Sequence, residues 1–117
     1  MENKSELKIE NAIITSTMLG YEDHGILTCG FQLDRQLGSQ GFGYYALAGK
    51  DITSNYGIEF VKKILNTVGV DTWEELKGKH IRIKVGRSWG SKIVAIGNFM
   101  SDVWFDPEEF SKSYRKD

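Results

Sequence analysis

The stretch from Gly41 to Ala46, with the sequence GFGYYA, combines residue types and a spacing that could bind a ligand. It matches G-x-G-x-x-A, the pattern with which dinucleotide-binding proteins hold a pyrophosphate at the start of a helix. That motif needs a helix directly after the glycines and an acidic residue about twenty positions later, at the end of a second strand. Phe42–Leu47 has the composition of a strand instead, and no acidic residue closes a strand at that distance. We therefore predict a strand kinked by glycine, either packed under aromatic rings or facing a ligand or partner.

A second cluster combines cations with an aromatic ring. Arg87-Ser88-Trp89-Gly90 is followed by Lys92, and Arg82 and Lys84 lie on the polar side of the preceding strand. An aromatic ring can stack a base while neighbouring cations hold a phosphate, although the same residues also suit a solvated hairpin. The candidate ligand- or partner-binding residues of the chain are Gly41, Phe42, Gly43, Tyr44, Tyr45, Arg82, Arg87, Trp89 and Lys92.

No residue set in the sequence has the pattern of a catalytic or metal site. Cys29 lies five residues after His24, in the middle of a predicted strand and on its inward side, so a nucleophile–base contact is not expected. His24 and His80 are the two histidines, and they lack the spacing of a zinc site. We predict a polar turn at 22–24, a buried Cys29, no enzymatic activity, no cofactor and no metal.

Composition indicates one globular domain. The chain has 117 residues, of which 40% are hydrophobic, and a formal net charge of −1 from 15 basic and 16 acidic side chains. This balance disfavours a protein whose main task is to grip duplex nucleic acid, which normally requires a basic excess. The single cysteine suits a reducing compartment, and neither a membrane span nor a signal peptide is apparent. We expect a soluble, cytoplasmic protein whose residues 1–6 are disordered.

The periodicity changes twice along the chain. Apolar and β-branched alternation predicts strands over 7–20, 26–34, 42–47, 79–85 and 92–99, with 35–40 as a polar link. Ile58, Val61, Ile64, Leu65 and Val68 predict a helix over 54–68, ended by Gly69.

Capping patterns predict two shorter helices. Asp71 and Glu74 resemble a capping box before a helix ending at Lys77, and Asp106-Pro107 opens a last helix. Trp73 and the pair Trp104-Phe105 are expected to pack as core side chains. The order β-β-β-α-α-β-β-α predicts an α+β fold: a mostly antiparallel five-stranded sheet with one main helix on one face.

Several segments resemble a family of small proteins encoded by phages and prophages. They are 9–28 (IENAIITSTMLGYEDHGILT), 40–47 (QGFGYYAL), 57–84 (GIEFVKKILNTVGVDTWEELKGKHIRIK) and 95–110 (AIGNFMSDVWFDPEEF). The match spans nearly the whole chain, whereas the link over 35–40 departs from the family pattern. The resemblance brings no catalytic residues with it. It implies a phage setting, in which small accessory proteins often counter host defences.

From these observations we expect a non-enzymatic phage accessory protein that inhibits a bacterial defence system by binding, in the host cytoplasm. It would either block a protein complex, as an anti-CRISPR protein does, or sequester a cyclic-nucleotide-type signal, in some cases as a homo-oligomer. For the first form, the acidic side chains Glu22, Asp23, Asp102, Asp106, Glu108 and Glu109 would mimic or mask a nucleic-acid surface. The alternative is a structural, assembly or replication-associated interaction module of the phage.

Overall fold

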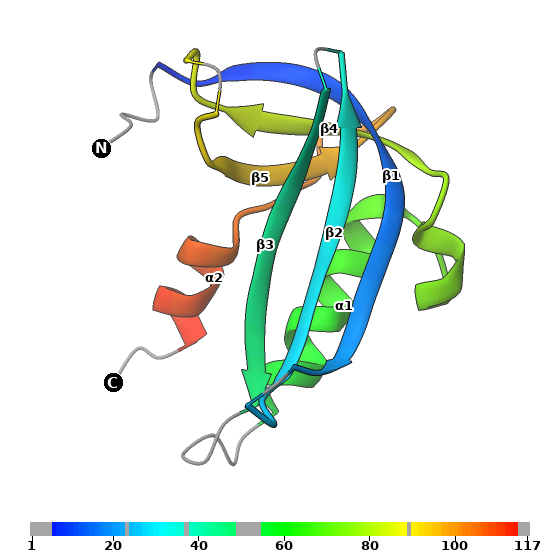
Figure 1. Ribbon diagram of the computed structural model, residues 1–117, viewed down its shortest axis with the longest axis vertical. Helices are drawn as coiled ribbons and strands as arrows, with labels where there is room; N and C mark the ends of the chain where they lie inside the picture. The colour runs from blue at the N-terminus through cyan, green and yellow to red at the C-terminus, as the bar shows by residue number, and fades with distance from the viewer. Residues whose placement is uncertain (1–5, 23, 37, 49–54, 89, 115–117) are drawn as a thin grey trace.

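The fold is a curved six-stranded antiparallel sheet with helices against it (Figure 1). The computed structural model describes residues 6–22, 24–36, 38–48, 55–88 and 90–114. The spatial strand order is β3-β2-β1-β4-β5-β6. The strands are β1 (Lys8–Tyr21), β2 (Leu27–Arg35), β3 (Gly38–Ala48), β4 (His80–Val85), β5 (Ile93–Asn98) and β6 (Trp104–Phe105), and the helices are α1 (Tyr56–Val68), the 3-10 turn η2 (Trp73–Leu76) and α2 (Pro107–Tyr114).

The α+β prediction is confirmed, with one strand more than expected. Trp104 and Phe105 pair with Gly97 and Ile96 of β5, which makes them a short edge strand instead of a lead into α2. The pairing was not apparent from the sequence because a two-residue strand has no periodicity. β3 is also longer than predicted: it begins at Gly38, so most of the expected polar link over 35–40 belongs to the β2–β3 hairpin.

β1 joins the two halves of the sheet. Its first part, Lys8–Ile13, pairs with β4, and its second part, Ile13–Tyr21, pairs with β2. A register shift between Ile14 and Ser16 accompanies the bend of this strand. As a result, β1–β3 and β4–β5 cross at a steep angle in Figure 1, and α1 lies behind β1–β3.

The core lies between the concave side of the sheet and α1. As predicted, Cys29, Phe31 and Leu33 point inward from β2, and Ile81, Ile83 and Val85 point inward from β4. Burial raises the pKa of the Cys29 thiol to about 12, because the thiolate would lose its hydration. The predicted buried Cys29 is therefore confirmed, and this thiol behaves as a small apolar side chain.

The orientation of α1 differs from the predicted one. The expected apolar face included Ile58, but Ile58 is 66% exposed, whereas Tyr56 and Phe60 are buried. The ring of Phe60 meets that of Phe105 edge-on, with 5.0 Å between centroids, so aromatic packing decides which face of the helix is buried. Gly69 ends the helix in the left-handed region, as predicted. Ser54, the predicted first residue, and residues 1–5 lie outside the described ranges.

The turn after α1 is a 3-10 turn with its capping box one residue later than predicted. Thr72, and not Asp71, is the N-cap, and Glu75, and not Glu74, accepts the backbone N–H of Thr72 at 3.1 Å. Trp73 packs on Phe31, with 5.9 Å between ring centroids, as a partly buried core side chain. Among the described helices, none is long and apolar enough to cross a membrane.

Candidate functional site

A bulge at Gly43 determines which of the two adjacent tyrosines of β3 faces the core. Gly43 has φ +53°, a left-handed conformation that favours glycine, and the β2–β3 register shifts between Cys29 and Phe31. Consecutive strand residues alternate between the two faces, so a regular strand would place Tyr44 on the same side as the buried Phe42. The extra residue at the bulge reverses this, and Tyr45 shares the core side with Phe42 while Tyr44 lies on the outer side. The predicted kink in this strand is confirmed, and it has a specific effect: it presents an aromatic ring to solvent.

The ring of Tyr44 lies across the neighbouring strand. A Cβ atom at Gly30 would come within 2.7 Å of Cδ1 and 3.0 Å of Cε1 of this ring, so only glycine leaves room for it. Gln32 donates a hydrogen bond from Nε2 to the Tyr44 hydroxyl at 2.9 Å. The side chain nevertheless remains 52% exposed. Tyr44 is thus held flat against the sheet, with the opposite side of its ring open to solvent.

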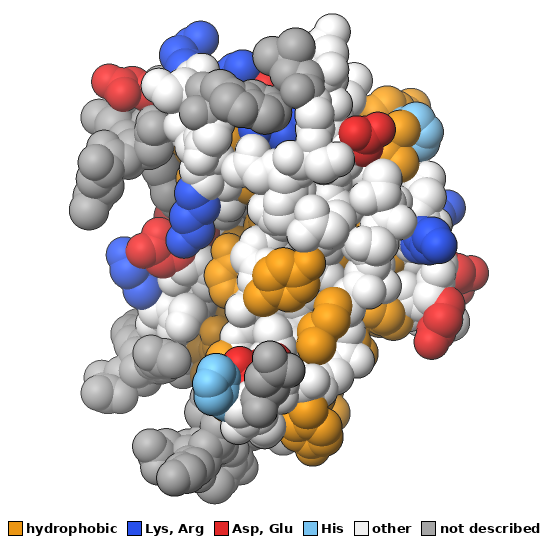
Figure 2. Space-filling model, in the orientation of Figure 1, with side chains coloured by type: hydrophobic (Ala, Val, Ile, Leu, Met, Phe, Trp, Pro, Cys, Tyr) orange, Lys and Arg blue, Asp and Glu red, His pale blue; other side chains and the backbone are white. Residues whose placement is uncertain are grey.

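The surface around Tyr44 is almost without charge. We call the outer side of β1–β3 the platform face. It consists of Ser16, Met18, Gly20, Gly30, Gln32, Asp34, Ser39, Gly41, Tyr44 and Ala46. Asp34 is the one charged side chain among these residues. Figure 2 shows the same side of the molecule as a broad surface of polar and backbone atoms with a few isolated hydrophobic side chains.

Phe42 and Tyr45 support the platform face from beneath. Phe42 is 1% exposed and stacks on Phe31 at a centroid distance of 5.7 Å, so it is a core residue. Tyr45 lies between Phe42 and Phe60, each ring centroid being 5.5 Å away. Burial, followed by the carboxylates of Asp106 and Glu108, raises the pKa of Tyr45 to about 12.

Lys92 and Tyr45 line the same cavity, of about 240 Å³, beside β3. Its other lining residues come from α1, β5 and α2, and are Tyr56, Val94, Pro107, Glu108 and Ser111. Arg87 and Lys92 are exposed, whereas the predicted stacking residue Trp89 lies outside the described residues. The structure therefore brings one predicted cation, Lys92, to the predicted β3 stretch.

Arg82 does not join the loop cations as the sequence suggested. Its guanidinium donates to the backbone carbonyls of Asn98, at 2.9 Å, and Ser101, at 2.8 Å. The same group lies 4.9 Å from the ring centroid of Trp104, and Nζ of Lys84 lies 4.4 Å from it. Trp104 thus packs on the outer side of β4–β6 beneath two cations, not in the core as predicted. The contacts of Arg82 and Lys84 with Trp104 could not be predicted from the sequence, because β6 itself was not predicted.

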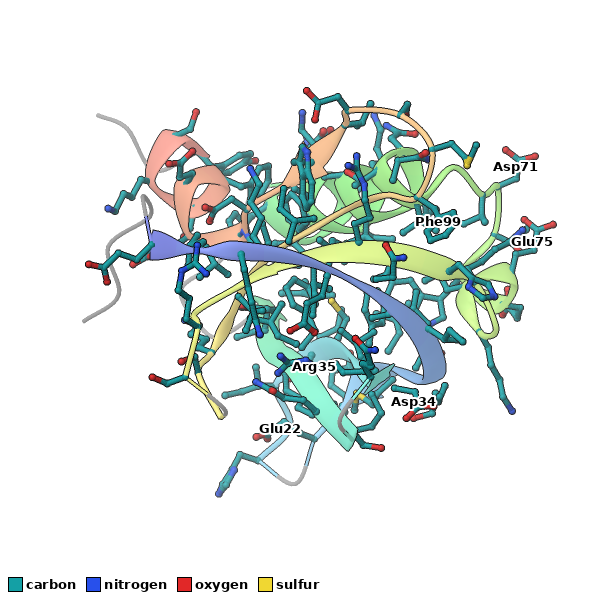
Figure 3. All side chains as sticks on the ribbon, turned by 90° about the horizontal axis from the view of Figure 1, so that it is seen from above. Glu22, Asp34, Arg35, Asp71, Glu75 and Phe99 are labelled. Carbon is teal, nitrogen blue, oxygen red and sulfur yellow. The ribbon has the colours of Figure 1, made fainter. Side chains whose placement is uncertain are left out.

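A buried ionic network connects β1, β2 and β3 to the β4–β5 loop. Arg35 is 6% exposed and donates from Nε and Nη2 to the two carboxylate oxygens of Glu10, at 3.0 and 2.8 Å. Its Nη1 donates to Oε1 of Gln40 at 2.5 Å, and Gln40 in turn donates from Nε2 to the carbonyl of Ser91 at 2.7 Å. Figure 3 shows Arg35 between the two halves of the sheet.

This network was not among the sequence-based candidates, although a pattern pointed to it. Arg35 continues the inward series of β2 after Cys29, Phe31 and Leu33, and a buried arginine requires a partner. The sequence did not indicate that Glu10, 25 positions earlier, would be that partner. Through Gln40, Arg35 and its partners hold the start of β3, the strand that carries Tyr44.

The remaining candidate for chemistry is a surface turn. Glu22 accepts the backbone N–H of His24, and its carboxylate lies 3.2 Å from Nδ1 of the same histidine, which lowers the pKa of Glu22. Cys29 is 1% exposed and contributes nothing to this turn. Within the described ranges, no three His, Cys, Asp or Glu side chains lie close enough to hold a metal ion.

The structure thus places the Tyr44 ring on the outer side of the sheet, while Lys92, just before β5, lines a cavity with Tyr45. A comparison of the sequence with protein-family models found no match, and neither did a comparison with curated proteins.

Proposed function

We propose that the protein is a non-enzymatic phage accessory protein that acts by binding, and that its platform face binds a single-stranded nucleic acid. The observation that carries this proposal is the position of the Tyr44 ring. The ring lies over Gly30, its hydroxyl accepts a hydrogen bond from Gln32, and the side chain is still 52% exposed. Every nucleobase has a π-face, so such a ring stacks on bases without demanding a particular sequence.

The order of the elements supports the same ligand. We infer that β1–β5 and α1 form a partly open barrel of the oligonucleotide/oligosaccharide-binding (OB) type. The support is the five antiparallel strands, the helix between the third and fourth of them, and the Gln40–Ser91 contact that brings β3 beside β5. OB domains bind their ligands across β2 and β3 and with the β1–β2 and β4–β5 loops. The inference from fold to ligand is an analogy, and the site itself supplies the chemical argument.

The distribution of charge favours single strands over duplexes. Bases need a surface with little charge, which the platform face provides. Phosphates need cations, and we infer that Arg87 and Lys92 supply them from the β4–β5 loop, where both side chains are exposed. With two such cations and a net charge of −1, we expect weak to moderate affinity and a shallow dependence on salt. A stacked duplex offers no free base faces to Tyr44.

Replacing Tyr44 with alanine is expected to weaken the binding of a fluorescein-labelled 12-nucleotide oligo(dT) by about 5- to 150-fold. This range corresponds to the loss of one base–aromatic stack, about 1–3 kcal/mol. Fluorescence anisotropy at low salt measures the effect. Tyr44→Phe keeps the ring and loses only the hydrogen bond from Gln32, so it should bind within about threefold of the unmodified protein.

Tyr114→Ala is the matched control, because Tyr114 is an exposed tyrosine on α2, outside the platform face. Equal losses for Tyr44→Ala and Tyr114→Ala would contradict the assignment of the face. Oligo(U), cyclic dinucleotides and a 12-base-pair duplex are tested in parallel. Preferential binding of the duplex, or no binding of any single strand at millimolar concentration, would refute the proposal.

Inhibition of a host defence is the biological role that we propose for this binding, given the phage resemblance of the sequence. Withholding a nucleic acid or nucleotide signal from a defence complex in the host cytoplasm requires no catalysis. A tagged copy expressed in the host should therefore co-purify with nucleic acid that nuclease treatment removes. Recovery of a nuclease-resistant protein complex would favour the surface-blocking form of inhibition instead.

A further inference from the structure

The loop between β5 and β6 exposes three large apolar side chains within five residues. Phe99 is 39% exposed, Met100 is 86% exposed and Val103 is 45% exposed. Single exposed apolar residues are ordinary on protein surfaces, whereas a group on one loop indicates an interaction site. We call residues 99–103 the apolar loop. It lies in the half of the sheet formed by β4–β6, away from Tyr44.

The apolar loop is held rigidly by two polar residues. Asn98 accepts the backbone N–H groups of Met100, at 2.8 Å, and Ser101, at 2.9 Å, through its Oδ1 atom. Its Nδ2 atom donates to the carbonyls of Thr67 and Val68 at the end of α1, both at 3.1 Å. Arg82 closes the loop from the other side with its bond to the Ser101 carbonyl. Because the loop is ordered before any partner arrives, little conformational entropy is lost on binding.

Beside the apolar loop is a depression of about 470 Å³. Its walls are Val68, Lys79, His80, Asn98, Phe99 and Met100. The His80 ring meets the Phe99 ring edge-on at a centroid distance of 5.5 Å, which closes one side. Lys79 contributes the one formal charge among these lining residues, and it is positive.

Three acidic residues, Asp71, Glu75 and Asp102, lie near the apolar loop and the depression. Asp71 and Glu75 lie at the same end of the molecule as Phe99 (Figure 3), but neither lines the depression. The Glu75 carboxylate accepts the backbone N–H groups of Asp71 and Thr72, at 2.9 and 3.1 Å. Asp102 accepts the indole N–H of Trp104 at 2.7 Å. Lys79 is the one formal charge in the lining of the depression, and it also interacts electrostatically with the Glu75 carboxylate.

We propose that the apolar loop and the adjoining depression bind an acidic peptide segment of a partner protein, with an apolar anchor side chain seated against Phe99 and Met100. A carboxylate next to that anchor would pair with Lys79. Methionine suits the contact because its flexible, polarizable side chain adapts to different anchors. The surface lies apart from the platform face, so the protein would connect a single-stranded nucleic acid to a second protein.

The test is an NMR titration of the ¹⁵N-labelled full chain with two synthetic peptides. One carries three aspartates followed by leucine and phenylalanine, and the other carries three lysines in place of the aspartates. The acidic peptide is expected to shift the amides of residues 79–80 and 98–103 with micromolar to low-millimolar affinity. The basic peptide should bind at least about fivefold more weakly, because it places like charges beside Lys79.

Charge reversal at Lys79 separates this proposal from non-specific adsorption. Lys79→Glu should weaken the acidic peptide about fivefold or more and reverse the preference between the two peptides. Lys77→Glu is the matched control: Lys77 is exposed and two positions away but does not line the depression, so its effect should be below twofold. Met100→Ser should also weaken binding several-fold without loss of fold, since Met100 is almost wholly exposed.

Four results would overturn the proposal. The first three are shifts confined to other surfaces, equal affinity for the two peptides, and equal effects of Lys79→Glu and Lys77→Glu. A fourth is a shift of the same amides with protein concentration alone, which would mean that a second copy occupies the surface. None of these outcomes depends on nucleic-acid binding, so this proposal and the one for the platform face fail independently.

Discussion

Replacing Arg35 with methionine is expected to lower the free energy of unfolding by about 3–5 kcal/mol, the usual cost of removing one partner of a buried ion pair. The Arg35 side chain is 3% exposed and that of Glu10 is 18% exposed. Without the guanidinium, the Glu10 carboxylate keeps Lys8, at 2.9 Å, as its ionic neighbour among the described residues. Gln40 would also lose a hydrogen-bond donor, so the hold on the start of β3 would weaken. Urea unfolding followed by circular dichroism measures the change.

Two variants test whether the loss arises from the buried charge. Arg35→Met combined with Glu10→Leu removes both charges and should be less destabilised than Arg35→Met alone, because no carboxylate is left without its partner. Lys62→Met removes one member of an exposed pair, Lys62–Glu59 at 3.6 Å, and should change stability by less than about 0.5 kcal/mol. Comparable losses at Lys62 and Arg35 would contradict the importance of burial.

The same pair makes stability depend on acid pH. The hydrogen bonds from Arg35 are the main reason why the pKa of Glu10 lies below its ordinary value of 4.5 in the folded protein. A carboxyl group with a lowered pKa contributes stability that is present above its unfolded-state pKa and is lost as the pH falls through the folded value. The stability difference between the unmodified protein and Arg35→Met should therefore shrink below about pH 4.5. A constant difference from pH 7 to pH 3 would contradict this linkage.

Replacing Gly43 with alanine is expected to cost about 2–5 kcal/mol of stability. A left-handed conformation costs an L-residue about 1–2 kcal/mol, and overpacking adds about 1–3 kcal/mol. A Cβ atom at this position would overlap Cε2 of Tyr45, so the Tyr45 ring, which packs between those of Phe42 and Phe60, would have to shift. The variant should also lose oligo(dT) binding, because the bulge at Gly43 is what directs Tyr44 outward.

Gly78→Ala separates the two contributions at Gly43. Gly78 has φ +90°, and nothing lies within 4 Å of the position of an added Cβ, so alanine there meets the conformational cost alone. Gly20→Ala has neither cost, since its surroundings are open and its φ is not in the left-handed region. The expected order of destabilisation in thermal unfolding is Gly43, then Gly78, then Gly20. Equal effects at Gly43 and Gly78 would show that Tyr45 yields freely.

The features that follow from local pattern were predictable. Alternation in β2 and β4 identified their inward faces, a glycine marked the end of α1, and the alternation with period changes gave the α+β class. Each of these depends on residues within one or two turns or strands of each other. The glycine-aromatic stretch was also recognisable. Each glycine in a strand costs conformational entropy on folding, so four glycines beside aromatic residues indicate a backbone that departs from a regular strand.

The features that depend on distant partners were decided by the tertiary structure. Arg82 is oriented by carbonyls of the β5–β6 loop and by Trp104, and Arg35 by Glu10, so their roles appear only when the strands are assembled. The face of α1 that is buried depends on Phe105, from the other end of the chain. The sequence by itself determined that glycines would kink β3 beside aromatic residues. Only the tertiary structure decided that Tyr44 would lie open on Gly30 while Tyr45 packs in the core, because that choice depends on the register with β2.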